Sequence, residues 1–121
     1  MDVLRNILWV AAGGAAGSVM RYLVSRWIVA ASFPWATFTV NIVGSLLIGL
    51  LVGLASKETL SAEMRLLLVT GFCGGFTTFS TFANESYGML ESGHILTTAL
   101  YVSTSVFAGI LAVYIGFLVS R

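Results

Sequence analysis

The sequence predicts an all-α integral membrane protein with four transmembrane helices, and composition is the first reason. The chain has 121 residues, of which 58% are hydrophobic and 9% charged, against roughly 25% charged in an ordinary soluble domain. A soluble domain of this size needs many more polar groups to cover its surface. The second reason is that four apolar stretches are each long enough for a membrane helix of about 20 residues. These observations exclude a soluble globular enzyme, a disordered tail and a coiled coil.

The first span is expected over residues 4–29. No charged residue occurs from Asn6 to Met20, and the apolar character continues beyond Arg21. A basic start followed by small residues is also typical of a signal peptide. The continuation past Arg21 makes the segment long enough to cross the membrane, so we count it as a span.

The second span, residues 35–56, is the clearest of the four. It contains no charged residue from Trp35 to Ser56. Pro34 stands immediately before it and suits a helix start, because the N–H that proline lacks is not needed there. A short polar loop that includes Lys57 then separates this span from the next.

Two more spans complete the chain. The third is expected over residues 65–91, and the fourth over residues 95–120, where Arg121 closes it. The loops between the spans are short, so residues 1–121 are expected to form one domain with little mass outside the membrane. A separate catalytic domain does not fit into such a chain.

Positive charges barely distinguish the two sides of the membrane. With four spans, the N-terminus, the second loop and the C-terminus share one side. That side carries Arg5, Lys57, Arg65 and Arg121, and the other side carries Arg21 and Arg26. This bias is weak by the positive-inside rule, so it permits insertion in either orientation and an antiparallel dimer built from one sequence. A bundle of four such helices is also too thin to enclose a pore easily, and we therefore expect a dimer.

Glycines recur at a spacing of four residues in three of the spans. The pairs are Gly13 with Gly17, Gly49 with Gly53, and Gly71 with Gly75. Small residues at this spacing let membrane helices approach each other closely. The pairs therefore predict a tightly packed bundle, and they say nothing about what the bundle does.

The third span contains the most unusual sequence of the chain. Gly74 and Gly75 each weaken a helix by roughly 1 kcal/mol relative to alanine, and four Ser or Thr residues follow between Thr77 and Thr81. Hydroxyl side chains can satisfy the backbone groups that a break leaves free. We therefore predict a helix break near Gly74–Thr77, where free carbonyls can bind a cation and free N–H groups favour an anion. The alternative is a continuous, glycine-rich helix face.

Three phenylalanines repeat every third residue in the same region. Helical residues three apart share a face, so Phe76, Phe79 and Phe82 are expected on one side. Such a stripe usually faces lipid or the core, but here the rings alternate with Ser80 and Thr81. Since an aromatic ring has a positive edge, an edge-on phenylalanine can favour an anion without a formal charge.

Three uncharged polar side chains of other spans are further candidates. Asn41 is an amide inside the second span, where it either hydrogen-bonds between helices or offers its NH₂ group to a pore. Tyr101 and Ser105 stand four residues apart in the fourth span and therefore share a face. A column of hydroxyls can form a wet track, although Ser and Thr also bond back to their own helix.

Arg21 and Glu85 are the charges nearest to the interior of a span. Charged groups at such depth are usually paired or placed in a water-filled cavity, so we expect an ion pair or a shared vestibule. Glu85 can alternatively end the third helix at the membrane surface. His94 and Cys73 are interpreted as a loop residue and a small buried residue.

The sequence lacks the residues for several other chemistries. A single cysteine excludes an internal disulfide and, with a single histidine, a zinc site or a Ser–His–Asp triad. The net charge of +1 gives no indication of nucleic-acid binding.

Three stretches resemble motifs of the Fluc (CrcB) fluoride channel family, and the resemblance runs over nearly the whole chain. The run GGFTTFSTF at residues 74–82, followed by Glu85, resembles the family's third-helix signature. The run TFTVNIVG at residues 37–44 resembles its second-helix motif. Its first-helix motif is matched by Gly13, Gly14, Gly17 and Arg21.

The resemblance implies an antiparallel, dual-topology homodimer with two separate pores in a prokaryotic inner membrane. It implies passive and selective export of fluoride by a protein that is not an enzyme and has no catalytic residues. The expected partners are fluoride, the lipid bilayer and a second copy of the chain, with no nucleic acid.

The resemblance also implies roles for single residues. The implied pore and fluoride-binding residues are Asn41, Phe79, Ser80, Thr81, Phe82, Tyr101 and Ser105. The implied vestibule residues are Arg21, Thr37 and Glu85. The backbone carbonyls of Gly74 and Thr77 match positions that hold a structural sodium ion at the centre of the dimer.

The sequence departs from the family's pattern at two positions. Ala36 replaces a glycine that is common before the motif threonine. Gly109 stands one turn past Ser105, where a related sequence can carry another hydroxyl. The second departure leaves the outer end of the hydroxyl track open.

Other classes of protein fit part of the sequence. Proton-coupled small multidrug exporters share the length, the four spans and dual topology, but they need a carboxylate within the first span, where this chain has none. A purely structural subunit fits the glycine pairs but leaves the third-span motif unexplained. A heterodimer with a paralogue is a further alternative, against which the weak charge bias argues.

Overall fold

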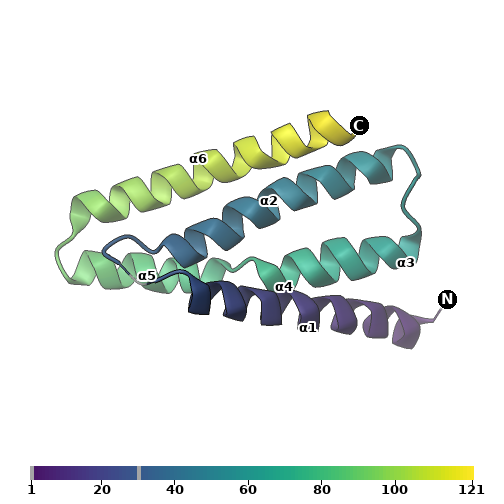
Figure 1. Ribbon diagram of the computed structural model, residues 1–121, viewed down its shortest axis with the longest axis horizontal. Helices are drawn as coiled ribbons and strands as arrows, with labels where there is room; N and C mark the ends of the chain where they lie inside the picture. Colours follow the sequence, from purple (N-terminus) through teal and green to yellow (C-terminus); the bar gives the residue numbers. More distant parts are fainter. Residues whose placement is uncertain (1, 30) are drawn as a thin grey trace.

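The computed structural model describes residues 2–29 and 31–121. In this part of the chain the regular elements are all helical, and four helices are long and apolar enough to cross a membrane. Both ends of the chain and the connection between the second and third spans lie at one end of the bundle (Figure 1). The other two connections lie at the opposite end. The predicted all-α architecture of four apolar helices is therefore confirmed.

Three of the four spans are single helices. They are α1 (Val3–Trp27), α2 (Trp35–Ser56) and α6 (Ile95–Ser120). Asp2 starts α1, because its carboxylate accepts hydrogen bonds from backbone N–H groups of the first turn. α1 ends at Trp27 rather than at residue 29. Pro34 stands immediately before α2, as a residue without an N–H group can.

The third span consists of four helical segments and one interruption. They are α3 (Ala62–Arg65), the π-helix η1 (Leu66–Cys73), the single turn α4 (Gly74–Phe76) and, after the extended residues Thr77 and Thr78, α5 (Phe79–Glu91). We call α3, η1 and α4 the first half of this span, and α5 its second half.

The predicted helix break is confirmed, but it lies at the hydroxyl residues rather than at the glycines. Gly74 keeps helical dihedral angles (φ −62°, ψ −39°), whereas Thr77 and Thr78 are extended, with ψ of 162° and 120°. Gly75 serves packing instead, because a Cβ there would lie 2.5 Å from the carbonyl oxygen of Gly14 in α1. The threonines interrupt the helix because their side chains can replace its backbone hydrogen bonds.

Glycines set how closely the helices approach. α1 packs along η1 and α4, and α2 packs along α6. A Cβ at Gly13 would lie 1.9 Å from the carbonyl oxygen of Leu67, and one at Gly49 would lie 2.2 Å from that of Val113. Any side chain at these positions would push the helices apart. The predicted role of the glycine pairs in helix packing is therefore confirmed.

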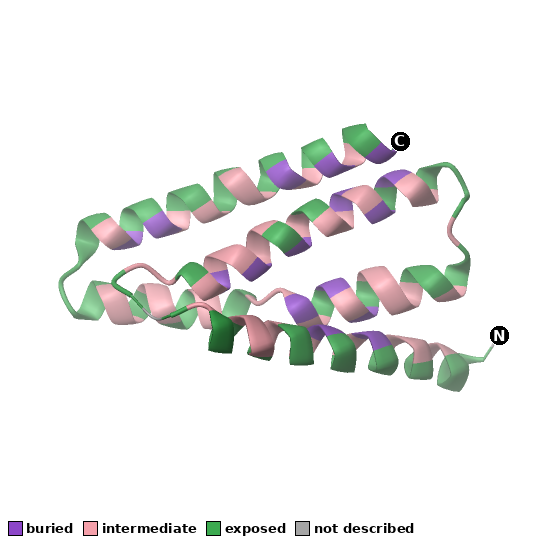
Figure 2. Cartoon of the chain, viewed as in Figure 1, coloured by how far each residue is buried: buried purple, intermediate pink, exposed green. Residues whose placement is uncertain are grey.

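Few residues of the bundle are buried (Figure 2), and many of its large apolar side chains are exposed. On α6, Phe107 and Ile110 are 74% and 65% exposed. The largest fully buried side chains are Tyr101 of α6 and Val40 of α2. A soluble monomer rarely exposes so much apolar surface. In a membrane this surface contacts lipid or another subunit.

Candidate functional site at the helix break

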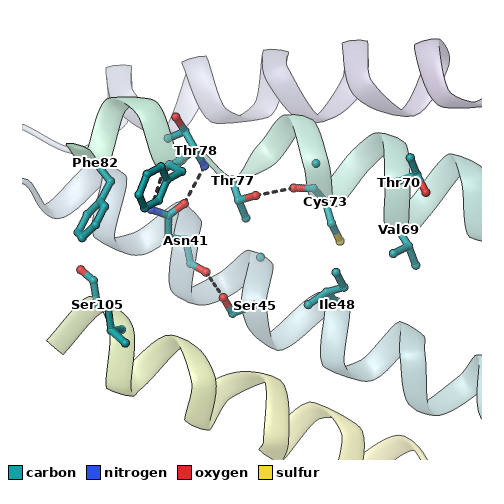
Figure 3. A pocket seen from close by; sticks show the side chains of 14 residues that line it. Asn41, Ser45, Ile48, Val69, Thr70, Cys73, Thr77, Thr78, Phe82 and Ser105 are labelled. Atoms are coloured by element: carbon teal, nitrogen blue, oxygen red, sulfur yellow. Dashed lines mark hydrogen bonds between the residues drawn. The ribbon is translucent and has the colours of Figure 1, made fainter. Parts of the chain in front are cut away.

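A groove lies beside the helix break, between α2, α6 and the third span (Figure 3). Its volume is about 600 Å³. Its lining includes Asn41, Gly74, Thr77, Phe79, Phe82 and Ser105, which the sequence analysis singled out. Of the described residues that line it, none carries a formal charge. The groove is therefore a neutral space in which apolar walls carry a few polar groups.

Threonine side chains stabilise the break on both sides. Thr77 closes the first half, because its N–H and its Oγ1 both donate to the carbonyl oxygen of Cys73, at 3.1 and 2.8 Å. Thr78 starts α5, because its Oγ1 accepts from the N–H of Thr81 at 3.2 Å. Among the described residues, none of the hydrogen bonds at the break uses the carbonyl oxygen of Gly74 or Thr77. These two oxygens are free to meet a ligand.

Asn41 of α2 holds the extended residue Thr78 by two hydrogen bonds (Figure 3). Its Oδ1 accepts from the Thr78 N–H at 2.8 Å, and its Nδ2 donates to the Thr78 carbonyl oxygen at 3.1 Å. The amide therefore joins two helices, as one interpretation of the sequence expected. Since an NH₂ group has two hydrogens, this bond uses only one of them, and the interpretation of Asn41 as a donor to a pore stays a prediction.

The three phenylalanines do not share one face. Phe79 is 79% exposed and Phe82 is partly buried, and their ring centroids lie 5.8 Å apart at the groove. Phe76 is buried and stacks on Phe72 in the first half, with ring centroids 5.5 Å apart. The expected stripe of three rings is wrong, because the break falls between Phe76 and Phe79 and resets the helical register.

Ser80 and Thr81 lie on other sides of α5 from the two rings. Successive helical residues are rotated by about 100°, so these hydroxyls turn away when Phe79 and Phe82 face the groove. Ser80 is exposed, and Thr81 lines a separate pocket of about 120 Å³ that also contains Arg21. The expectation that these hydroxyls line the same space as the rings is therefore not met.

Glu85 is held by two hydroxyl groups. Thr37 Oγ1 donates to its Oε2 at 2.9 Å, and the Tyr101 hydroxyl donates to its Oε1 at 2.8 Å. Tyr101 is completely buried, and its ring centroid lies 5.0 Å from that of Phe82. Since α5 continues beyond Glu85, this carboxylate does not simply end the third helix. It connects α2, α5 and α6 next to the groove.

Arg21 does not pair with Glu85, so the expected ion pair is wrong. Its Nε donates to the carbonyl oxygen of Gly75 at 3.0 Å. In a continuous helix that oxygen would accept from the N–H of Phe79, so the guanidinium replaces a hydrogen bond that the break removes. Arg21 and Glu85 line different pockets. Thr37 connects them, because it lines the Arg21 pocket and donates to Glu85.

Ser105 of α6 contributes a buried hydroxyl that has no partner among the described residues. It lies across the groove from Asn41 and next to Phe82 (Figure 3). Buried polar groups are nearly always hydrogen-bonded, so this oxygen suits a ligand or a water molecule. The predicted hydroxyl track therefore has one occupied member, Tyr101, and one open member.

Several side chains that line the groove were not predicted as site residues, among them Ser45, Thr70 and Cys73. Ser45 stands one turn after Asn41 and donates to its backbone carbonyl oxygen at 2.6 Å. The spacing of four residues was a signal that both share a face. Cys73 is buried as expected, and it also lines the groove. Nothing in its sequence neighbours indicates that second property.

Comparison with known proteins assigns the chain to a family. Residues 8–117 match the family model described as CrcB-like protein, Camphor Resistance (CrcB). The chain belongs to the CrcB family. A relative from Chlorobaculum tepidum is 49% identical over 98% of this chain and 97% of its own length. Another, from Agrobacterium fabrum, is 49% identical over 96% of both chains, and one from Flavobacterium psychrophilum is 44% identical over 98% of both.

Each of these three relatives is named as a fluoride-specific ion channel, FluC. The CrcB family is a family of ion channels, so this chain is not an enzyme. The resemblance that the sequence motifs indicated is confirmed. A multi-pass membrane protein of this family needs a path for its ion, and the neutral groove at the break is the candidate for it.

Proposed function

We propose that the chain is a fluoride-selective channel that lets fluoride leave the cytoplasm passively. The names of the CrcB relatives support the choice of ion. The observation that carries the proposal is the groove at the break, where Asn41 and Ser105 offer open donors beside the rings of Phe79 and Phe82. The apolar helices and the bacterial relatives support a place in a prokaryotic inner membrane.

Neutral donors suit the passage of a small, strongly hydrated anion. Fluoride must exchange part of its water shell for protein groups in such a groove. An amide N–H, a hydroxyl and the positive edge of a phenyl ring each supply a contact without a full charge. Conduction requires sites that bind well enough to admit the ion and weakly enough to release it. A lysine or arginine in the lining would hold fluoride too tightly for rapid release.

We place an entrance for fluoride near Arg21, Thr37 and Glu85. The guanidinium of Arg21 attracts anions toward the small pocket that it lines. Glu85 would repel them, but the hydroxyls of Thr37 and Tyr101 occupy both of its oxygens. Tyr101 then connects this entrance to Phe82 at the groove, because the two rings are in contact.

Two copies are proposed to assemble as an antiparallel, dual-topology homodimer with two pores. The ring of Phe79 is 79% exposed although it stands at the groove, so one wall of the groove is left open in a single chain. A second copy supplies that wall. The weak difference in positive charge between the two sides allows both orientations to insert.

A structural sodium ion is proposed at the centre of this dimer. Sodium is coordinated by backbone carbonyls where membrane helices unwind, and the Gly74 and Thr77 oxygens take no part in the hydrogen bonds described at the break. Gly74 is exposed, and a Cβ there would meet no atom within 4 Å, so a partner can approach. The residues present therefore fit the ion. Its positive charge would offset the partial negative charges of the free carbonyls.

Ion flux from liposomes tests the proposal. The purified protein is reconstituted into liposomes loaded with potassium fluoride, the external solution is diluted, and valinomycin is added to balance the charge. A fluoride electrode should record rapid efflux, and chloride-loaded liposomes should release no chloride. Equal release of both ions would contradict selectivity. No release from monodisperse protein would contradict a homomeric channel and favour a heterodimer or a structural subunit.

A further inference from the structure

We infer that Asn41 is a positioning residue that fixes the helix break, so that one side chain supports both the groove and the proposed sodium site. The part of this inference that concerns sodium rests on the proposed function. The hydrogen bonds of Asn41 are independent of it.

The amide of Asn41 replaces the backbone partner that Thr78 loses at the break. In a continuous helix the Thr78 N–H would donate to the carbonyl oxygen of Gly74, four residues earlier. Here the same N–H donates to Asn41 Oδ1 at 2.8 Å. The Gly74 oxygen is consequently free, at a depth in the membrane where unpaired backbone groups are costly. The Asn41 amide and a cation would therefore replace the two partners of the same lost hydrogen bond, the amide at the Thr78 N–H and the cation at the Gly74 oxygen.

The second hydrogen bond makes the contact specific for an amide. Asn41 Nδ2 donates to the Thr78 carbonyl oxygen at 3.1 Å, so one side chain meets the donor and the acceptor of one residue. Two strands that exchange both bonds between paired residues use the same pattern. A leucine of similar size keeps the packing of Asn41 but offers neither group.

The helix that carries Asn41 is fixed against the break on both sides of it. Val40 is 2% exposed and lines the Arg21 pocket together with Thr78. At Gly44, one turn further, a Cβ would lie 2.2 Å from the Thr77 Cγ2 atom. Because α2 packs this closely on the break, the two hydrogen bonds to Thr78 orient the Asn41 amide. The second hydrogen of the Asn41 NH₂ group, which Thr78 does not use, is then held in a fixed direction as well.

A substitution at Asn41 should therefore weaken sodium binding although Asn41 is not a sodium ligand. Without the amide, the Thr78 N–H can return to the Gly74 oxygen and remove it from the cation site. A role confined to the groove would lower fluoride flux and leave sodium binding unchanged. Sodium dependence separates the two roles, whereas flux alone does not.

The test compares Asn41→Leu and Asn41→Ala with the matched control Asn84→Leu. Asn84 is an exposed amide on α5. The thermal midpoint of each purified protein is measured against sodium concentration, with potassium keeping the ionic strength constant. We expect the sodium concentration for half-maximal stabilisation to rise at least about tenfold in both Asn41 variants, as the loss of two hydrogen bonds implies. It should not change in Asn84→Leu.

The result that overturns the inference is a sodium response of Asn41→Leu equal to that of the unmodified protein, which would leave the sodium proposal standing. No sodium response in the unmodified protein would overturn the sodium proposal and the coupling together. The carbon-13 chemical shifts of Thr78 then decide the rest. A change from extended toward helical values in Asn41→Leu supports the positioning role, and unchanged shifts overturn it.

Discussion

The two halves of the third span follow each other in sequence and differ in how they are held. The first half is packed against α1 through backbone contacts. A Cβ at Gly71 would lie 2.8 Å from the carbonyl oxygen of Val10. In the second half, a Cβ at Gly88 would meet no atom within 4 Å, and α5 has no buried residue among those described. The first half is therefore closely packed against a neighbouring helix, whereas the second half is loosely packed.

The same residue type shows what this difference does. Phe76, in the first half, is 6% exposed and stacks on Phe72. Phe79, three residues later, is 79% exposed at the groove. The extended residues between them turn one ring into the core and the other toward the open side. The packed half thus gives the break a fixed position from which the second half presents its rings.

The largest effect is expected from breaking the packed half with Gly13→Ala. The new Cβ would lie 1.9 Å from the carbonyl oxygen of Leu67, so backbone has to move. We expect a loss of at least about 3 kcal/mol in the free energy of unfolding, the upper range for an overpacked core. Unfolding in mixed micelles, followed by circular dichroism, measures it.

Gly88→Ala is the matched control in the second half. Its Cβ would enter open space within a helix, where alanine is more stable than glycine by roughly 0.5–1 kcal/mol. The two substitutions should therefore have opposite signs. Equal losses in both would show that the halves do not differ in packing.

A second pair of substitutions sharpens the comparison by separating stability from conduction. Phe82→Ile removes a ring from the groove and should lower fluoride efflux at least about tenfold, which corresponds to roughly 1.4 kcal/mol in the barrier. Its unfolding free energy should change little, since Phe82 is only partly buried. Phe76→Ile changes the shape of a buried residue and should cost about 1–3 kcal/mol of stability. Flux per folded channel should then be retained. Undiminished flux in Phe82→Ile would count against the groove as the pore.

The spans could be predicted from the sequence because the signals that define them are local. Uncharged runs of sufficient length give the four helices, and Pro34 marks the start of α2. A local signal also predicted that the third span is broken, since hydroxyl residues follow two glycines there. The position of the break could not be predicted from local sequence. Whether Gly75 bends the chain or packs depends on Gly14, which is far away in sequence.

The sequence predicted which polar residues need hydrogen-bond partners, but it did not predict which partners they have. The cost of a charge inside a membrane indicated that Arg21 and Glu85 need partners, but opposite charge suggested the wrong pair. Arg21 donates to a backbone carbonyl oxygen that the break leaves free, and Glu85 accepts from two hydroxyl groups. Sequence cannot show which backbone groups a break exposes, because that depends on where the helix ends. The same uncertainty misplaced Phe76 relative to Phe79.

The smallest effect is expected for Tyr101→Phe, which weakens the tie between the second half and α6. The substitution removes the hydroxyl that donates to Glu85 at 2.8 Å, while Thr37 still donates to the other oxygen. The ring contact with Phe82 remains. We expect a loss of about 1 kcal/mol in the free energy of unfolding and a fall in fluoride efflux of less than about tenfold. Tyr114→Phe is the control, because Tyr114 is 58% exposed on the same helix.

The size of the change in flux decides what the Tyr101 hydroxyl does. If it only positions Glu85, flux and stability should fall together and modestly, because the carboxylate keeps one of its two donors. If Tyr101→Phe lowers flux as strongly as Phe82→Ile without a loss of stability, the hydroxyl itself contacts the ion. The path of the ion would then be lined by the Tyr101 hydroxyl of α6 as well as by the phenyl rings of the second half. No change in either quantity, as expected for Tyr114→Phe, would show that the second half does not depend on the Tyr101 hydroxyl.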